Sequence, residues 1–161
     1  MDVILIAAVT QDGFIARHAH ETVNWSKDLY LFKEQTMGWP LIVGSNTFKC
    51  LQKELKGRDI IVVHREDNPQ KIIENLKTEK CFIAGGGKTN TLFAPHLTHL
   101  YLTPHPNIFG SGVRLFSGKT DEMNLIFEAK IPIHEEKGLY QFQYRINSET
   151  HHSGFITADD G

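Results

Sequence analysis

The sequence has 161 residues, of which 40% are hydrophobic and 22% are charged. This is typical of one globular domain and excludes a disordered chain. Its 17 basic and 19 acidic side chains give a net charge of −2, which argues against a nucleic-acid partner, because proteins that bind phosphate backbones carry a basic excess. No apolar run approaches the about 18 residues of a membrane-spanning helix, so we predict no membrane partner.

Apolar segments alternate with polar or amphipathic segments along the chain. Five of them predict buried strands, at residues 3–9, 41–43, 59–63, 81–84 and 99–103. Helices are expected from near Lys27 with Ser26 as cap, from 45 to about 53, at 69–76 and at 89–93. Residues 125–133 and 139–146 predict an antiparallel pair around a turn at 135–138. We therefore predict a single α/β domain with flanking helices, whose central sheet is mostly parallel and ends in a C-terminal antiparallel hairpin.

We expect one domain over residues 1–147 and a polar C-terminal tail over 148–161 that is disordered or is ordered only by a neighbour. Residues 1–13 lack the basic region of a signal peptide and predict the first strand. The polar segment 17–24 is a candidate mobile loop. Cys50 and Cys81 form no CxxC pair, so free thiols in a reducing cytoplasm are expected, and one disulfide is the alternative.

Two turns combine a strand end, a glycine and a helix start, at residues 43–47 and 84–89. A helix start presents unpaired N–H groups to an anion, and glycine lets the backbone approach it closely, so the pair predicts a site for the two ends of a dinucleotide. Packing at a strand end is the alternative. A P-loop would need glycine at position 82, which is Phe82, and no GxGxxG motif is present.

Two charged residues allow two interpretations each. Asp28 near a helix start either stabilises the helix dipole or points into a pocket to bind an amidine-like ligand. Arg58 before a strand is either solvated or binds a ligand carboxylate. The nine histidines form no HExxH or paired Cys/His spacing, so we predict no metal site.

Taken in chain order, several segments together resemble the dihydrofolate reductase family. They lie between about residues 3 and 116, and comprise 6–9 with Asp12 and Ile15, then 28–36, 40–48, Leu51, Leu55, 57–58, 83–87 and 100–103. The resemblance implies an oxidoreductase of tetrahydrofolate biosynthesis and one-carbon metabolism, which reduces 7,8-dihydrofolate with NADPH by hydride transfer from nicotinamide C4 to pterin C6. It also implies binding of antifolates such as methotrexate. A monomer or a homodimer is expected.

The resemblance assigns a role to individual residues. Asp28 would bind the pterin 2-amino group and ring N3, and the hydroxyl of Thr103 would bridge the two. The implied substrate-binding residues are Ile6, Ala8, Leu29, Phe32, Leu51, Leu55 and Arg58, the last of them for the glutamate carboxylate. The implied cofactor-binding residues are Ala8, Ile15, Gly44, Ser45, Asn46, Thr47, His64, Arg65, Ala84, Gly85, Gly86, Gly87, Lys88 and Thr89. Gly85–Gly86 would carry a cis peptide, and the 17–24 loop would close over the nicotinamide.

The chain also departs from the family pattern. Ser45 replaces a phosphate-binding arginine, Asn90 replaces an aromatic residue, and Trp25 precedes Asp28 by three residues and not five. Residues 108–116 resemble the related reductase of riboflavin synthesis, which acts on a ribosylaminopyrimidine phosphate. That reductase and a non-catalytic NADPH-binding protein are the two alternative functions.

Overall fold

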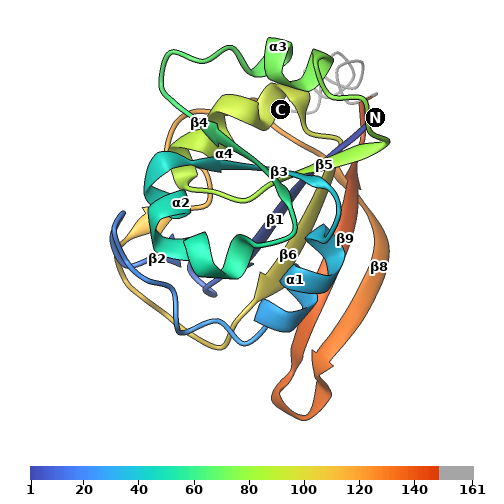
Figure 1. Ribbon diagram of the computed structural model, residues 1–161. Coiled ribbons are helices and arrows are strands. Elements are labelled where there is room, and N and C mark those ends of the chain that lie inside the picture. Colours follow the sequence, from blue (N-terminus) through green and yellow to red (C-terminus); the bar gives the residue numbers. More distant parts are fainter. Residues whose placement is uncertain (149–161) are drawn as a thin grey trace, which may run out of the picture.

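A seven-stranded sheet forms the centre of the molecule, and its strands lie in the order β4-β3-β5-β1-β6-β9-β8 (Figure 1). The computed structural model describes residues 1–148, apart from the side chains of residues 52 and 53, so the expected tail lies outside the described residues beyond Ser148. The first five strands in this order, β4, β3, β5, β1 and β6, run parallel to one another. Strands β9 and β8 form a hairpin that is added in the antiparallel direction beside β6. The predicted fold class is confirmed. The strand bounds are β1 Asp2–Val9, β3 Pro40–Gly44, β4 Asp59–Val63, β5 Lys80–Ile83, β6 His99–Pro104, β8 Leu125–His134 and β9 Leu139–Ile146.

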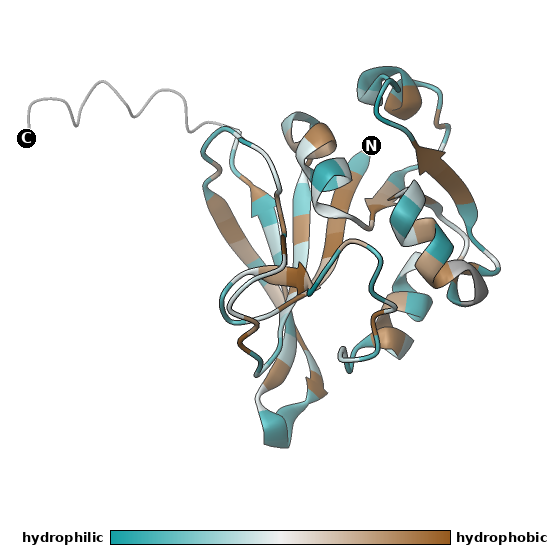
Figure 2. Cartoon of the chain, turned by 90° about the vertical axis from the view of Figure 1, so that its left-hand side faces the viewer, coloured by the Kyte–Doolittle hydropathy of each residue, from teal (hydrophilic) through white to brown (hydrophobic). Residues whose placement is uncertain are grey.

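The apolar run of β1 is explained by its burial on both faces of the sheet. Val3 and Leu5 belong to one hydrophobic cluster, whereas Ile4 and Ile6 belong to a second cluster on the opposite face. Strand β1 pairs in parallel with β5 on one side and with β6 on the other. Figure 2 shows the apolar strands in the interior and a hydrophilic turn at the tip of the β8–β9 hairpin.

Short helices cover both faces of the sheet. Phe32 of α1 and Phe48 of α2 pack against the cluster of Ile4, whereas Ile72 of α3 and Phe93 of α4 pack in the cluster of Val3. In the described chain no helix reaches the length and apolar character needed to cross a bilayer. The helices are α1 Leu29–Thr36, α2 Ser45–Leu51 with the 3-10 turn Gln52–Leu55, α3 Pro69–Glu74, and α4 Gly87–Phe93 with the 3-10 turn Ala94–His96.

The predicted start of the first helix was wrong. The helix begins at Leu29 and not near Lys27, and Asp28 rather than Ser26 occupies the N-cap position. The backbone carbonyl of Asp28 accepts the N–H of Phe32 at 3.0 Å, which is the first bond of the helix. The Asp28 side chain makes no capping bond, which leaves its carboxylate available elsewhere.

Other boundaries also differ from the prediction. The α3 helix ends at Glu74 and not at residue 76, and α4 begins at Gly87 and not at Thr89, because the N–H of Asn90 already reaches the carbonyl of Gly86 at 2.9 Å. Two short strands, β2 Phe14–Ala16 and β7 Val113–Arg114, were not predicted and pair with each other. They connect the segment after β1 to the segment after β6.

Candidate active site

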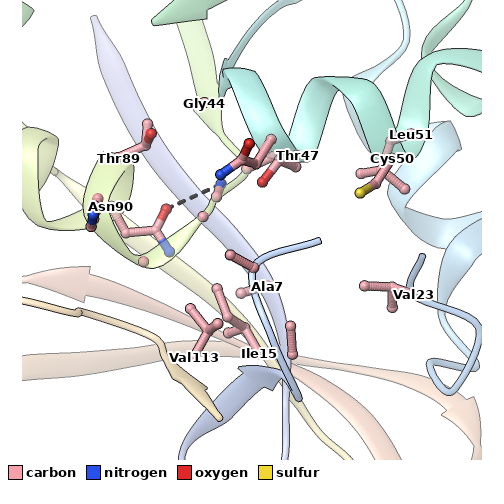
Figure 3. Close-up of a pocket in the computed structure, with 18 of the residues that line it drawn as sticks. Ala7, Ile15, Val23, Gly44, Thr47, Cys50, Leu51, Thr89, Asn90 and Val113 are labelled. Atoms are coloured by element: carbon pink, nitrogen blue, oxygen red, sulfur yellow. Dashed lines mark hydrogen bonds between the residues drawn. The ribbon is translucent and has the colours of Figure 1, made fainter. Parts of the chain in front are cut away.

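A cavity of about 930 Å³ lies beside the carboxyl ends of β1, β3 and β5. Figure 3 shows Thr47, Cys50 and Leu51 projecting from α2 on one side of it, and Ile15 and Val113 on the opposite side. Ligand sites of α/β sheets lie at this end of the strands.

Most of the predicted site residues line this one cavity. Thr103, Leu55 and Arg58 are not among the lining residues. Thr103 and Leu55 are buried, and the Arg58 guanidinium binds the backbone near the C-terminal end of α1. The predicted residues that line the cavity are Ile6, Ala8, Ile15, Asp28, Leu29, Phe32, Gly44, Ser45, Asn46, Thr47, Leu51, His64, Arg65, Ala84, Gly85, Gly86, Gly87, Lys88 and Thr89.

Sequence reasoning missed several lining residues. Cys50 lies three residues after Thr47 on the same short helix, and this i, i+3 spacing could have found it. Val23 and Trp25 come from the loop before α1, and Val113 comes from the two-residue strand β7. No periodicity marks such segments, so Val113 carries no local signal, whereas Val23 belongs to the 17–24 loop that the resemblance already placed over the nicotinamide, and Trp25 was noted as the tryptophan before Asp28.

Asp28 is a buried carboxylate at the inner end of the cavity, with 8% of its surface exposed. Burial raises the pKa of Asp28 above its ordinary value, because an ionised carboxylate is poorly solvated there. The nearby hydroxyls of Thr103 and Ser26 oppose this rise, because each can donate a hydrogen bond to the carboxylate. A carboxylate in this setting is well suited to bind a ligand group that offers N–H donors.

Two buried polar atoms in this part of the protein make no hydrogen bond of normal geometry with another described residue. They are the Thr103 hydroxyl and the Trp25 indole N–H. Thr103 is the β6 residue opposite Ala8 of β1, and it is fully buried. Since buried polar groups in proteins are nearly always satisfied, the Trp25 N–H indicates a polar ligand or water, whereas the Thr103 hydroxyl lies near enough to the Asp28 carboxylate to donate to it.

The glycine turn after β5 is built from closely packed backbone. The Gly85–Gly86 peptide is cis, as predicted, and the carbonyl of Gly85 accepts the N–H of Gly44 at 2.8 Å. A Cβ atom on Gly44 would lie 2.6 Å from the Thr89 hydroxyl. The two glycine turns therefore lie directly against each other and present backbone, without side chains, to the cavity.

Asn90 holds this turn in place from behind. Its side-chain oxygen accepts the N–H of Gly85 at 3.1 Å, a bond drawn in Figure 3, and its amide nitrogen donates to the carbonyl of Leu115 at 2.9 Å. Only 1% of Asn90 is exposed. An aromatic residue could make neither bond. Asn90 departs from the family pattern, and its two hydrogen bonds fix the Gly85 turn to the carbonyl of Leu115.

Replacing Asn90 by alanine is expected to lower the free energy of unfolding by about 1–3 kcal/mol, because two buried backbone groups would lose their partners. NADPH affinity should fall with it, since the Gly85 turn would loosen. Urea titration measures the first effect and calorimetry the second. Replacing the exposed Asn75 by alanine is the control, and an equal loss there would refute the role of Asn90.

Three comparisons with known proteins bear on this geometry. The sequence model of the family described as "Dihydrofolate reductase" matches residues 2–146. The chain belongs to the dihydrofolate reductase family. It is 31% identical over 117 residues to dihydrofolate reductase type 3 of Salmonella typhimurium, covering 64% of this chain and 71% of that protein. It is 28% identical over 130 residues to the Bacillus subtilis (strain 168) dihydrofolate reductase, covering 73% and 76%.

A solved structure supports the fold independently. The dihydrofolate reductase of Enterococcus faecalis, complexed with NADP(H) and RAB-propyl, superposes with a TM-score of 0.69 at 21% identity, over 91% of this chain and 97% of that one. The predicted family and enzyme class, an NADPH-dependent oxidoreductase, are confirmed. These matches favour dihydrofolate reductase over the riboflavin-pathway relative.

The Arg58 guanidinium is fixed by hydrogen bonds within the protein, in addition to the carboxylate contact that the resemblance implies for it. Its guanidinium donates to the Lys33 carbonyl at 2.6 Å, to the Thr36 hydroxyl at 3.1 Å and to the Lys56 carbonyl. Partial burial lowers the pKa of Arg58, and these acceptors hold its charge at the C-terminal end of α1. Its predicted contact with a glutamate carboxylate stays a prediction.

The segment that leads into the predicted mobile loop 17–24 is held against the segment after β6. Asp12 accepts the Thr10 hydroxyl at 2.6 Å and the N–H groups of Phe109 and Gly110 at 3.2 and 2.7 Å. The Arg17 guanidinium lies 4.4 Å from the centre of the Phe109 ring. Residues of this loop line the dihydrofolate reductase cavity, so it forms one of the cavity walls.

Proposed function

We propose that this chain reduces 7,8-dihydrofolate to tetrahydrofolate with NADPH. The observation that carries the proposal is the buried Asp28 carboxylate beside the buried Thr103 hydroxyl, at one end of a cavity whose other end is lined by glycine turns. A pterin offers an amino group and a ring N–H in one plane, which complement this acid and hydroxyl.

The residues around Asp28 would hold the pterin ring. Asp28 would accept from the 2-amino group and ring N3, and Thr103 would bridge to the same amino group from β6. Leu29, Phe32 and Leu51 supply apolar surface from α1 and α2. Asp28 would also support a positive charge developing on the ring, because charge stabilisation by a fixed group is strong in a buried site.

The opposite end of the cavity fits a dinucleotide cofactor. Side chains at Gly85 and Gly86 would occupy the space in front of the Thr47 hydroxyl, at 3.7 and 3.5 Å, and their absence leaves that space open to a ligand. Arg65 and Lys88 line the same end and supply positive charge where Ser45 supplies none. NADPH, when bound, supplies the hydride. Ala8 and Ile15 would contact the nicotinamide, and His64 and Arg65 the 2′-phosphate.

The loop over residues 17–24 would exclude water from the reacting rings. Val23 and Trp25 line the cavity beside Asp28, and Ile15 lies on the β2 strand that anchors the loop to β7. Exclusion of water strengthens the interaction of Asp28 with the ring and prevents side reactions. The proton for pterin N5 would come from water.

The direct test is an assay of NADPH oxidation, measured as loss of its absorbance after mixing the purified protein with dihydrofolate. Rapid loss that methotrexate abolishes is the expected result. NADPH binding by calorimetry with no turnover would overturn the proposal in favour of a non-catalytic binder.

We also propose that the protein acts in the cytoplasm in one-carbon metabolism, as a monomer or homodimer. Cell fractionation can test its location, and sedimentation can test its oligomeric state.

Replacing Thr103 by valine is expected to raise the KM for dihydrofolate about 10-fold, the equivalent of one hydrogen bond. Stability should fall by no more than about 1 kcal/mol, because a methyl group fills the space of the buried hydroxyl and only its interaction with Asp28 is lost. Initial rates and urea titration measure the two effects. Thr103→Ser keeps the hydroxyl and is the control. A KM unchanged by valine would remove Thr103 from the substrate site.

A further inference from the structure

The imidazole of His105 lies behind the Asp28 and Thr103 pair, outside the cavity lining. His105 is 1% exposed and follows the end of β6, two residues after Thr103. Its backbone is fixed to the end of β1, because its N–H donates to the Val9 carbonyl at 2.7 Å. The ring therefore projects from a rigid part of the sheet.

Both ring nitrogens of His105 bind backbone groups. Nε2 accepts the N–H of Lys27 at 3.0 Å, so this nitrogen carries no proton. Nδ1 then carries the proton and donates it to the Thr103 carbonyl at 2.8 Å. One partner is Thr103 itself, and the other is Lys27, the residue immediately before Asp28. His105 therefore bonds the backbone of both segments that carry the proposed pterin-binding side chains.

The ring also contacts the loop that leads to α1. The Trp25 and His105 rings meet edge to face, with centroids 5.1 Å apart and an interplanar angle of 80°. Trp25 in turn lines the cavity beside Asp28. His105 thus connects the sheet to the segment 25–28 through one aromatic contact and one hydrogen bond.

We propose that His105 is a positioning residue that fixes the distance and direction between Asp28 and Thr103 by bonding the backbone of both segments. Asp28 lies at the end of the loop before α1, whereas Thr103 lies on strand β6. The two side chains therefore need a connection that fixes their relative position. Two polar groups act together on one ligand only when their separation is held within a fraction of an ångström. The inference rests on the proposed function for its effect on the substrate.

Two variants separate the hydrogen bonds from the packing of the ring. His105→Gln can place an amide oxygen near the position of Nε2 and so retains an acceptor for the Lys27 N–H, but it loses the ring. His105→Phe keeps a ring against Trp25 and loses both bonds. His105→Leu is a second variant without bonds, in case phenylalanine is too large for the site.

The first measurement needs no substrate. Exchange of the Lys27 amide hydrogen, followed by NMR, should be slow in the wild type and in His105→Gln, and about 10-fold faster in His105→Phe and His105→Leu. Equal exchange rates in all four proteins would overturn the proposed Lys27 bond. This result stands whether or not the protein reduces dihydrofolate.

The second measurement tests the effect on the site. The KM for dihydrofolate and the Kd for methotrexate should rise about 10-fold in His105→Phe and stay within about 3-fold of the wild type in His105→Gln, while NADPH affinity is unchanged in both. The reverse order, with glutamine impaired and phenylalanine normal, would show that only the ring packing matters and would overturn the inference. A wild type without activity would instead refute the proposed function.

Discussion

Asp28→Asn is expected to lower kcat for dihydrofolate by about 10²–10³-fold, and to leave NADPH affinity unchanged. The buried carboxylate can accept two N–H groups of a pterin at once, whereas an amide offers one oxygen and an N–H group that would face the ligand's donors. The amide is also neutral, so it cannot stabilise a positive charge on the ring. Steady-state rates and calorimetry with NADPH measure the two effects.

The same variant should be more stable than the wild type at pH 8. Burial raises the pKa of Asp28 in the folded state, so the folded protein holds this proton more tightly than the unfolded chain. The wild type therefore loses stability as the pH rises from the ordinary carboxyl range through the folded pKa, whereas asparagine does not titrate. The advantage of the variant should shrink as the pH falls toward 4.

Urea titrations of both proteins at pH 4 and pH 8 measure this difference. Asp59→Asn, at an exposed position at the start of β4, is the matched control for the change of side chain, and it should leave kcat unchanged. A variant of Asp28 with near-normal turnover would refute its place in the substrate site. A stability difference that grows toward low pH would contradict the effect of burial.

Gly87→Ala is expected to lower the free energy of unfolding by about 2–3 kcal/mol, near the upper end of the range for overpacking. A Cβ atom there would lie 2.0 Å from the Ser117 hydroxyl oxygen and 2.5 Å from the Arg114 carbonyl. The carbonyl belongs to the backbone and cannot rotate away. The start of α4 would have to shift, which should also weaken NADPH binding. Thermal unfolding and calorimetry test both expectations.

A second glycine gives the contrasting case. Gly44→Ala would meet the Thr89 hydroxyl at 2.6 Å, and the double variant with Thr89→Ala should recover most of the lost stability, because the obstructing atom is removed. Adding Ser117→Gly to Gly87→Ala should recover little, because the Arg114 carbonyl remains. Full recovery in that second pair would show that the backbone contact is unimportant.

Segments with a strong local pattern were predicted closely from the sequence. Strands β1, β3, β4, β5 and β6 were recovered because each is a short apolar run between turn residues, although β4 is an edge strand of which only Val63 is buried. The β8–β9 hairpin was recovered because both of its strands are long. Strands β2 and β7 have three and two residues, which is too short for a periodic pattern. The start of α1 was missed because the N-cap is Asp28, whose side chain makes no capping bond, so no local pattern distinguishes it from Ser26.

The site shows the same division. The glycine turns and the lining residues of α2 are each continuous in sequence, so their pattern is visible without the fold. The bracing role of Asn90 depends on Leu115, 25 residues away, and the proposed role of His105 depends on Lys27, 78 residues away. Such contacts between distant segments leave no local trace in composition or spacing.

The place of β1 in the sheet has a consequence for how the chain folds as it is synthesised. Residues 2–9 leave the ribosome early, yet their partners in β5 and β6 begin only at Lys80 and His99. This apolar strand therefore waits unpaired while more than half of the domain is made. Pairing over such long loops is slow. The nascent chain thus presents an apolar strand that chaperones can bind, and expression at low temperature should increase the yield of folded protein.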